Sequence, residues 1–191
     1  MGTTDEALTS EAEQLLRVFV DAKKEMLGQV ELVIASPMLR CRQTAGILFP
    51  DRTIRLEPGF SECDFGRFEY HNYSELNGNP DYQRFIDTAG KSGFPGGEDP
   101  EAFRLRCRRA FEGWLPALFH VRTAALVVHG GTIMSVMEAY AVPHRPYYDW
   151  QVRNGSGYVT ELTVEEGKTG KSCRIEVLSE FEPGAVGNEF V

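Results

Sequence analysis

The sequence predicts an α/β fold with a mostly parallel sheet, and two similar stretches of the chain carry that prediction. Val30–Ala35 and Ala124–Val128 are short and largely apolar, the pattern of strands buried on both faces of a parallel sheet. A signal for a helix start follows each strand at once, Ser36-Pro37 after the first and Thr132 after the second. A repeated passage from strand directly to helix is typical of α/β proteins.

The composition is that of an ordinary globular protein. The 191 residues are 42% hydrophobic and 25% charged, and we expect residues 1–191 to form one domain. A net charge of −8 argues against nucleic acid or an anionic membrane as a partner. No apolar run is long enough to span a membrane, and the acidic N-terminal residues do not resemble a signal peptide, so we expect a cytoplasmic protein. The sequence leaves room for a homodimer.

The cysteines and histidines show no metal-site spacing. Cys41, Cys63, Cys107 and Cys173 include no Cys-x-x-Cys pair and do not alternate with the four histidines as zinc ligands do. We therefore expect reduced thiols, no metal and no cofactor.

The first 56 residues predict two helices and two strands in alternation. Thr9 or Ser10 caps a helix whose apolar stripe continues to about Gly28. After the strand that ends at Ala35, Arg40 falls in the first turn of the next helix, near the edge of the sheet where ligands bind in open α/β folds. A solvated surface charge is the alternative interpretation. A short strand over Thr53–Leu56 follows.

Residues 57–69 mix acidic and aromatic residues, as in a folded loop over a site. A carboxyl group flanked by aromatic side chains would have a raised pKa and serve as a proton donor. The pattern does not choose among Glu62, Asp64 and Glu69, and a solvated carboxylate is the simpler interpretation of each.

The second half begins with an insertion, since residues 70–97 predict short helices and turns. Asp99-Pro100 begins a long amphipathic helix whose arginines, Arg106 among them, form a mostly solvated face. Near the end, Gly157–Val164 and Cys173–Glu180 predict an antiparallel hairpin at the side of the sheet, and the last ten residues predict a tail.

His129 lies where the second buried strand passes into a helix. The carboxyl edge of a sheet and the N-terminus of a helix both favour anions, so His129 is a candidate for binding one. A turn histidine with no task is the alternative.

Three segments, in this order, make the chain resemble the histidine phosphatase superfamily, which includes phosphoglycerate mutases and α-ribazole phosphatase. They are Ser36-Pro-Met-Leu-Arg-Cys-Arg-Gln-Thr-Ala45, Ser61-Glu-Cys-Asp-Phe-Gly-Arg-Phe-Glu69 and Val127-Val-His-Gly-Gly-Thr-Ile133. The similarity extends from Gly2 to about residue 165. It implies a three-layer α/β/α sandwich of the phosphoglycerate-mutase-like fold.

The resemblance also implies roles for particular residues. Arg40 matches an arginine of the family's phosphate pocket, Glu62 its proton donor and His129 its second pocket histidine. Arg106 is a looser match to a helix arginine, and with Gly130 it is expected to contact the substrate. Phosphoryl transfer needs fixed donors for charge that spreads over three oxygens, and a planar guanidinium holds two of them at once.

The family's Arg-His-Gly tripeptide, which carries the phosphorylated histidine, does not occur in this sequence. We therefore expect the sheet to lack its first strand, and the chain as printed to be inactive or nearly so. Two explanations are that the natural protein begins upstream of Met1, which we favour, or that this is a truncated product or paralogue.

The expected activity of the complete protein is hydrolysis of a small phosphomonoester, without metal, through a phosphohistidine. An α-ribazole phosphate-like metabolite is favoured over phosphoglycerate mutation because the insertion at 70–97 is short. Mutase-type phosphoryl transfer, a non-catalytic phosphate-binding or regulatory protein, and an unrelated doubly wound binding domain are the alternatives. The last of these would leave Arg40, Glu62 and His129 far apart.

Overall fold

A three-stranded parallel sheet lies at the centre of the computed structural model, which describes residues 2–71, 73–88, 90, 92–167 and 170–183. β1 (Leu32–Ala35) lies between β2 (Ile54–Leu56) and β3 (Ala124–Val127), and both pairings are parallel. Ala35 is in register with Leu56 on one side and with Val127 on the other. The three strands therefore end at one common edge, as the sequence predicts.

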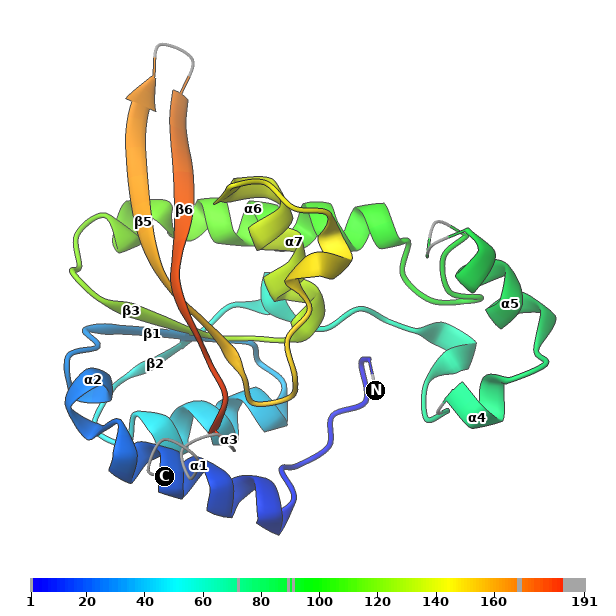
Figure 1. Ribbon diagram of the computed structural model, residues 1–191, viewed down its shortest axis with the longest axis horizontal. Helices are drawn as coiled ribbons and strands as arrows, with labels where there is room; N and C mark the ends of the chain where they lie inside the picture. Colours follow the sequence, from blue (N-terminus) through cyan, green and yellow to red (C-terminus); the bar gives the residue numbers. More distant parts are fainter. Residues whose placement is uncertain (1, 72, 89, 91, 168–169, 184–191) are drawn as a thin grey trace.

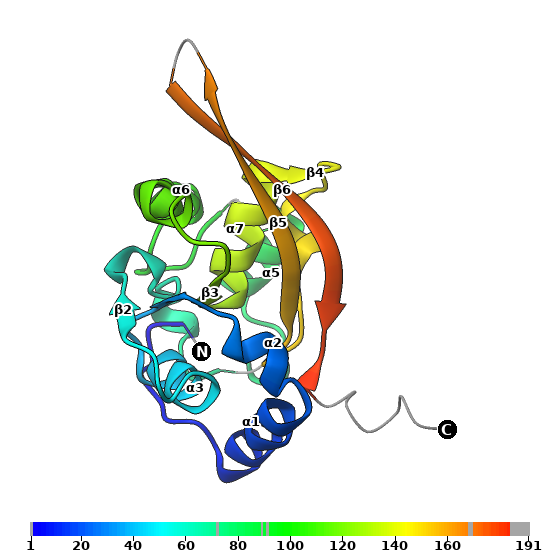
Figure 2. The same ribbon diagram turned by 90° about the vertical axis from the view of Figure 1, so that its left-hand side faces the viewer.

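Helices cover both faces of this sheet and make the three layers of the expected α/β/α sandwich (Figures 1 and 2). On one face α1 (Ser10–Ala22), followed by the short α2 (Lys24–Gly28), packs with α3 (Leu39–Leu48). On the other face lie α6 (Pro100–Leu118) and α7 (Gly130–Tyr140). Successive β1 side chains divide between the two layers, because Val33 joins the α1–α3 core and Ile34 joins the α6–α7 core.

The predicted hairpin forms, but it belongs to a second sheet. β5 (Gly157–Gly167) and β6 (Gly170–Phe181) pair antiparallel, and β4 (Ala141–Val142) pairs parallel with β6, giving the order β4-β6-β5. The expectation of one continuous sheet is therefore wrong. Within the described residues, β3 ends the first sheet and β5 ends the second, so neither strand pairs along its outer edge. Residues 184–191, most of the predicted tail, lie outside the described residues.

Two helices begin at different residues from those predicted. α3 begins at Leu39 with Met38 as its N-cap residue, because the hydroxyl of Ser36 accepts from the Met38 N–H at 3.3 Å and also contacts His129. α7 begins at Gly130 with His129 as its N-cap residue, and Thr132 is buried inside the helix. The predicted cap at Thr9 is present, with its side chain accepting from the Ala12 N–H.

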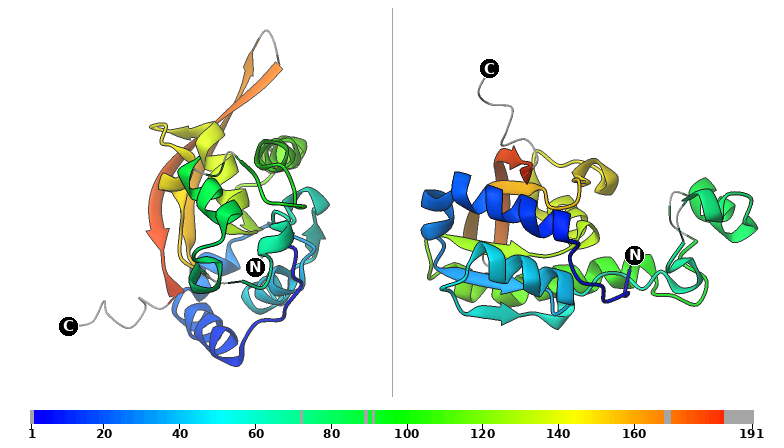
Figure 3. Two further views of the ribbon diagram at one scale, coloured as in Figure 1. Left: turned by 90° about the vertical axis from the view of Figure 1, so that its right-hand side faces the viewer. Right: turned by 90° about the horizontal axis from the view of Figure 1, so that it is seen from below.

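The insertion projects from the body as an arm of short helices (Figures 1 and 3). It follows the 3₁₀ turns η1 (Pro58–Phe60) and η2 (Gly66–Phe68) and contains α4 (Tyr73–Leu76) and α5 (Pro80–Asp87). Aromatic rings hold the arm to η2, since Phe94 lies 6.2 Å from Phe68 and 4.8 Å from Phe85 between ring centroids. A further 3₁₀ turn, η3 (Tyr147–Trp150), packs against α7.

None of the helices in the described ranges has both the length and the apolar character that crossing a bilayer requires.

Candidate functional site

The structure brings Arg40, Glu62 and His129 together, although 89 positions separate the first from the last. Arg40 lies in the first turn of α3, and the neighbouring Cys41 places its Sγ 3.6 Å from Nε2 of His129. Glu62, between η1 and η2, lies against the start of α7, where a β-carbon on Gly131 would be 2.6 Å from its Oε1. The expectation of scattered residues, which an unrelated binding domain implies, is therefore wrong.

His129 is 6% exposed and held by two buried neighbours. Its Nε2 lies 2.7 Å from Oγ of Ser36, and the thiol of Cys41 lies against the ring. Burial, with the positive charges of Arg40 and Arg106, lowers the pKa of His129 to about 3. The imidazole is therefore neutral near pH 7 and has one N–H to donate.

Glu62 has the electrostatics of a proton donor. Burial raises the pKa of this carboxyl group, against the opposing effects of the Cys63 N–H, the Arg40 guanidinium and the Gly131 N–H. A carboxyl group with a raised pKa keeps its proton closer to neutral pH, which general acid catalysis requires.

Glu69 is one of the three carboxyl groups among which the sequence pattern did not choose a proton donor, and its pKa shifts in the opposite direction from that of Glu62. Burial acts to raise the pKa of Glu69, but hydrogen bonds from Gly2, Phe65, Thr4 and Thr3 together lower it to about 2. A carboxylate so stabilised does not give up a proton at neutral pH because it does not carry one. Asp64 accepts from the Gly66 N–H at 2.8 Å.

Arg40 does not present a free guanidinium. Its Nη1 donates to the carbonyl of Thr4 at 2.7 Å and its Nη2 to the carbonyl of Gly2 at 3.1 Å. The N-terminal residues therefore lie across the side chain that the resemblance assigns to phosphate. No sequence pattern indicated this contact.

Arg106, expected to contact the substrate, binds the protein itself. Its Nε and Nη2 make a bidentate pair with Glu98 at 2.9 and 2.7 Å, and its Nη1 donates to the carbonyls of Gly59 and Ser61. Four of its five N–H groups are used in this way. Arg106 thus fixes the segment that carries Glu62, and one N–H remains for a ligand.

The two glycines after His129 differ in their surroundings. No atom lies within 4 Å of the point where a β-carbon on Gly130 would stand, so the space beside this expected binding residue is open. At Gly131 the same atom would stand 2.6 Å from Glu62 and 2.8 Å from the ring of Phe103. Gly131 therefore allows Glu62 to approach α7.

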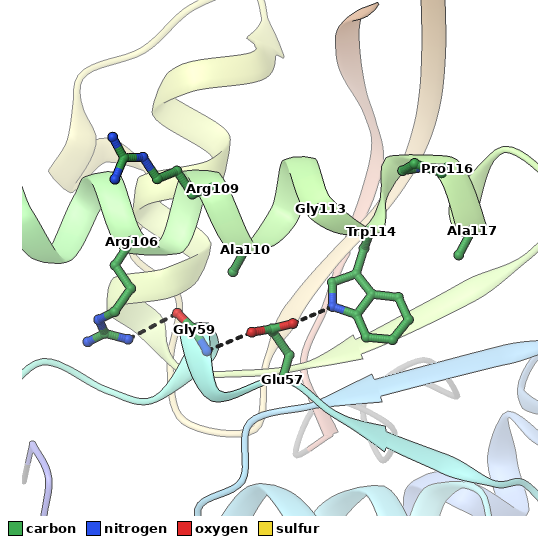
Figure 4. A pocket seen from close by; sticks show the side chains of 9 residues that line it. All are labelled: Glu57, Gly59, Arg106, Arg109, Ala110, Gly113, Trp114, Pro116 and Ala117. Atoms are coloured by element: carbon green, nitrogen blue, oxygen red, sulfur yellow. Dashed lines mark hydrogen bonds between the residues drawn. The ribbon is translucent and has the colours of Figure 1, made fainter.

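A cavity of about 680 Å³ lies between α6 and η1 (Figure 4). Glu57 bridges its walls, accepting from the Trp114 indole N–H at 2.8 Å and from the Gly59 N–H at 2.7 Å. Arg106 is the one predicted site residue in its lining. Arg40, Glu62 and His129 do not face it.

Over the described part of the chain, no three His, Cys, Asp or Glu side chains gather as ligands of one metal ion would. The site instead combines a guanidinium, a neutral imidazole, a carboxyl group with a raised pKa and the N-termini of α3 and α7, all at one sheet edge. Such an arrangement can bind a small anion and transfer a proton to or from it.

The chain belongs to the histidine phosphatase superfamily (branch 1), whose family description matches residues 1–173. A comparison with curated protein sequences gave no match.

Similar solved structures share the fold. A mycobacterial glucosyl-3-phosphoglycerate phosphatase is 21% identical, with a TM-score of 0.72 over 93% of this chain and 88% of that one. A phosphoserine phosphatase from Entamoeba histolytica is 22% identical, with a TM-score of 0.70 over 95% and 87%. A candidate alpha-ribazole-5'-P phosphatase from Escherichia coli is 18% identical, with a TM-score of 0.68 over 91% and 85%. At these identities the comparison supports the fold and leaves the substrate open.

Proposed function

We propose that this chain carries the phosphate pocket of a phosphatase that hydrolyses small phosphomonoesters through a phosphohistidine. The observation that carries the proposal is the meeting of Arg40, Glu62 and His129 at one edge of the sheet. Family membership supports the reaction class. Phosphatases among the similar structures, acting on different small phosphorylated compounds, support the substrate class.

Each of the three side chains has a task in this reaction. The Arg40 guanidinium holds two phosphoryl oxygens with its planar fork. The neutral His129 donates its N–H to an oxygen on which charge develops. Glu62 gives its proton to the leaving alkoxide and afterwards takes one from the water that hydrolyses the intermediate. Arg106 and Gly130 complete the pocket, Arg106 by fixing the Glu62 segment and Gly130 by leaving space for the ligand.

We further propose that the printed chain does not turn over phosphate esters by itself. Its other histidines, His71, His120 and His144, are exposed, and none shares the surroundings of His129. His129 is assigned to stabilise charge, so the covalent step lacks its nucleophile.

The test uses two forms of the protein, the 191-residue chain and a form extended by the residues that its own gene encodes in frame upstream. We expect inorganic vanadate to bind both forms, and phenyl phosphate to be hydrolysed by the extended form alone. Turnover by the 191-residue chain would contradict its proposed inactivity, and turnover that survives His129→Ala and Arg40→Ala would contradict the proposed pocket as well. A stop codon directly upstream, with vanadate binding retained, would favour the non-catalytic phosphate-binding alternative. Transfer of phosphate between positions of a phosphoglycerate, faster than its hydrolysis, would favour the mutase alternative.

A further inference from the structure

The N-terminal residues Gly2–Asp5 lie between the body and the arm (Figures 1 and 3). They contact the candidate site, because Arg40 donates to the carbonyls of Gly2 and Thr4. Gly2 and Thr4 are buried, whereas Asp5 is exposed. A β-carbon on Gly2 would stand 2.2 Å from the Cys63 carbonyl oxygen, so the backbone is seated closely against the segment that carries Glu62. The four residues are called the N-terminal strap below.

Glu69 holds the strap in place. Its Oε2 accepts from the Gly2 N–H at 2.9 Å and from the Thr4 hydroxyl at 2.8 Å, and its Oε1 accepts from the Thr3 N–H at 2.8 Å. Hydrogen bonds to a charged acceptor are about twice as strong as neutral ones. The carboxylate thus anchors three consecutive residues.

The anchored strap takes up the donors that a phosphate group would need. Arg40 gives one N–H from each of its Nη atoms to strap carbonyls, those of Thr4 and Gly2. The Leu39 N–H, at the start of the ten-residue α3, donates to Oδ1 of Asp5 at 2.5 Å. The carboxylate of Asp5 therefore sits at a helix N-terminus, an environment that favours any anion, and the preceding residue, Thr4, binds the Arg40 guanidinium.

We propose that the strap is a tethered inhibitor of the phosphate pocket, with the Asp5 carboxylate in the place that a phosphate oxygen takes when a ligand binds. This inference rests on the proposed function, because it assigns the same pocket. The exchange breaks only hydrogen bonds: a phosphate dianion displaces Asp5 from the Leu39 N–H and the two carbonyls from Arg40. Exposure of Asp5 lets it leave into water, while Glu69 keeps Gly2 and Thr4 nearby for return.

When a site is open in only a fraction of the molecules, its apparent Kd for a ligand equals the Kd of the open site divided by that fraction. Removal of the Asp5 carboxylate should therefore tighten phosphate binding, and so should weakening of the Glu69 anchor. Glu6 supplies a matched control, since it is the next residue, is exposed and has the same charge, and its side chain forms no hydrogen bond or ion pair within the described residues.

The experiment measures the affinity of the full 191-residue chain for inorganic phosphate by isothermal titration calorimetry at constant ionic strength. We expect Asp5→Ala to lower the Kd roughly tenfold. Glu69→Gln should lower it severalfold, whereas Glu6→Ala should leave it unchanged. Amide NMR signals of Thr3 and Thr4 should shift as phosphate is added, because the strap leaves Arg40.

Other outcomes separate the inference from the proposed function. Equal phosphate affinity in the unaltered chain and in Asp5→Ala would overturn the inference and leave the pocket in place. If Asp5→Ala and Glu6→Ala lowered the Kd for phosphate equally, the change in net charge alone would explain the effect, and the inference would also be overturned. Binding by neither the unaltered chain nor Asp5→Ala would overturn both the inference and the proposed function.

Discussion

Glu62 lies so close to α7 that a β-carbon at Gly131 would stand 2.6 Å from its Oε1 atom. The ring of Phe103 closes the same space from α6, with Cζ at 2.8 Å from that point. Only a residue without a side chain at position 131 allows the Glu62 carboxyl group to lie where it does. Gly130, one residue earlier, has no such neighbour and provides a control within the same helix turn.

Gly131→Ala should destabilise the fold and displace Glu62. Overpacking of this kind costs about 1–3 kcal/mol of unfolding free energy. Gly130→Ala should change the unfolding free energy by less than about 1 kcal/mol, because the added methyl group meets open space and alanine favours helix. Urea denaturation of both variants measures the difference. An unfolding free energy of Gly131→Ala equal to that of the unaltered chain would show that Glu62 and Phe103 move away from the added methyl group without loss of stability.

Arg40→Ala should weaken the binding of vanadate at least roughly tenfold, since hydrogen bonds to charged groups contribute about 1.5–3 kcal/mol each. Arg42→Ala is the control, because Arg42 lies on the same helix but is exposed, and its side chain forms no hydrogen bond or ion pair within the described residues. Titration calorimetry gives both affinities. If Arg42→Ala weakened vanadate binding and Arg40→Ala did not, the anion site would lie on the face of α3 that carries Arg42.

Glu62→Gln, made in a form of the protein that turns over phosphate esters, should slow an alkyl phosphate far more than an aryl phosphate. The alkoxide leaving group depends on a proton from Glu62, whereas a phenolate leaves with little help. The ratio of the two kcat values measures this directly. Asp64→Asn, two residues away, should leave that ratio unchanged. An equal slowing of both substrates by Glu62→Gln would assign the carboxyl group to positioning.

Acid should destabilise the fold through His129. The pKa of His129 is about 3 in the folded protein, below its ordinary value of 6.5, so the unfolded chain binds the proton more readily. The contribution of neutral His129 to the free energy of unfolding is therefore fully present above pH 6.5. It falls by on the order of 4 kcal/mol as the pH is lowered toward 3. Glu69, with its pKa lowered to about 2 from 4.5, adds to the loss below pH 4.5.

Urea denaturation at a series of pH values between 7 and 4 tests this dependence. His129→Gln should remove the loss of stability in acid above pH 4.5, where Glu69 contributes little and the raised pKa of Glu62 acts in the opposite direction. An unaltered slope in His129→Gln would mean that another group titrates there.

The sequence predicted the parts of the fold that follow from local patterns. The apolar strands, the cap at Thr9, the long helix after Asp99 and the short helices of the arm each depend on neighbouring residues. The meeting of Arg40 with His129 followed from parallel strands that end at one edge. The helix starts at Leu39 and Gly130 were mispredicted because the hydroxyls expected to cap them are buried in other contacts.

Sequence patterns did not indicate the features that depend on contacts between residues far apart in the chain. The bonds from Gly2 and Thr4 to Glu69 span 67 and 65 positions, and those from Arg106 to Gly59 and Ser61 span 47 and 45. Such bonds join a side chain to whatever backbone or hydroxyl the fold brings near, so they have no period and no motif. The division into two sheets likewise depends on which strand edges meet.

Hydrogen bonds connect the Trp114 indole through Glu57 to η1, so the fluorescence of Trp114 should report on the position of the segment that leads to Glu62. The Trp114 indole shares the Glu57 carboxylate with the backbone that leads to Glu62. Trp150, the second tryptophan of the chain, is 1% exposed and donates to the carbonyl of Arg145. Movement of the Glu62 segment should therefore change the fluorescence of one indole while the other serves as a constant reference.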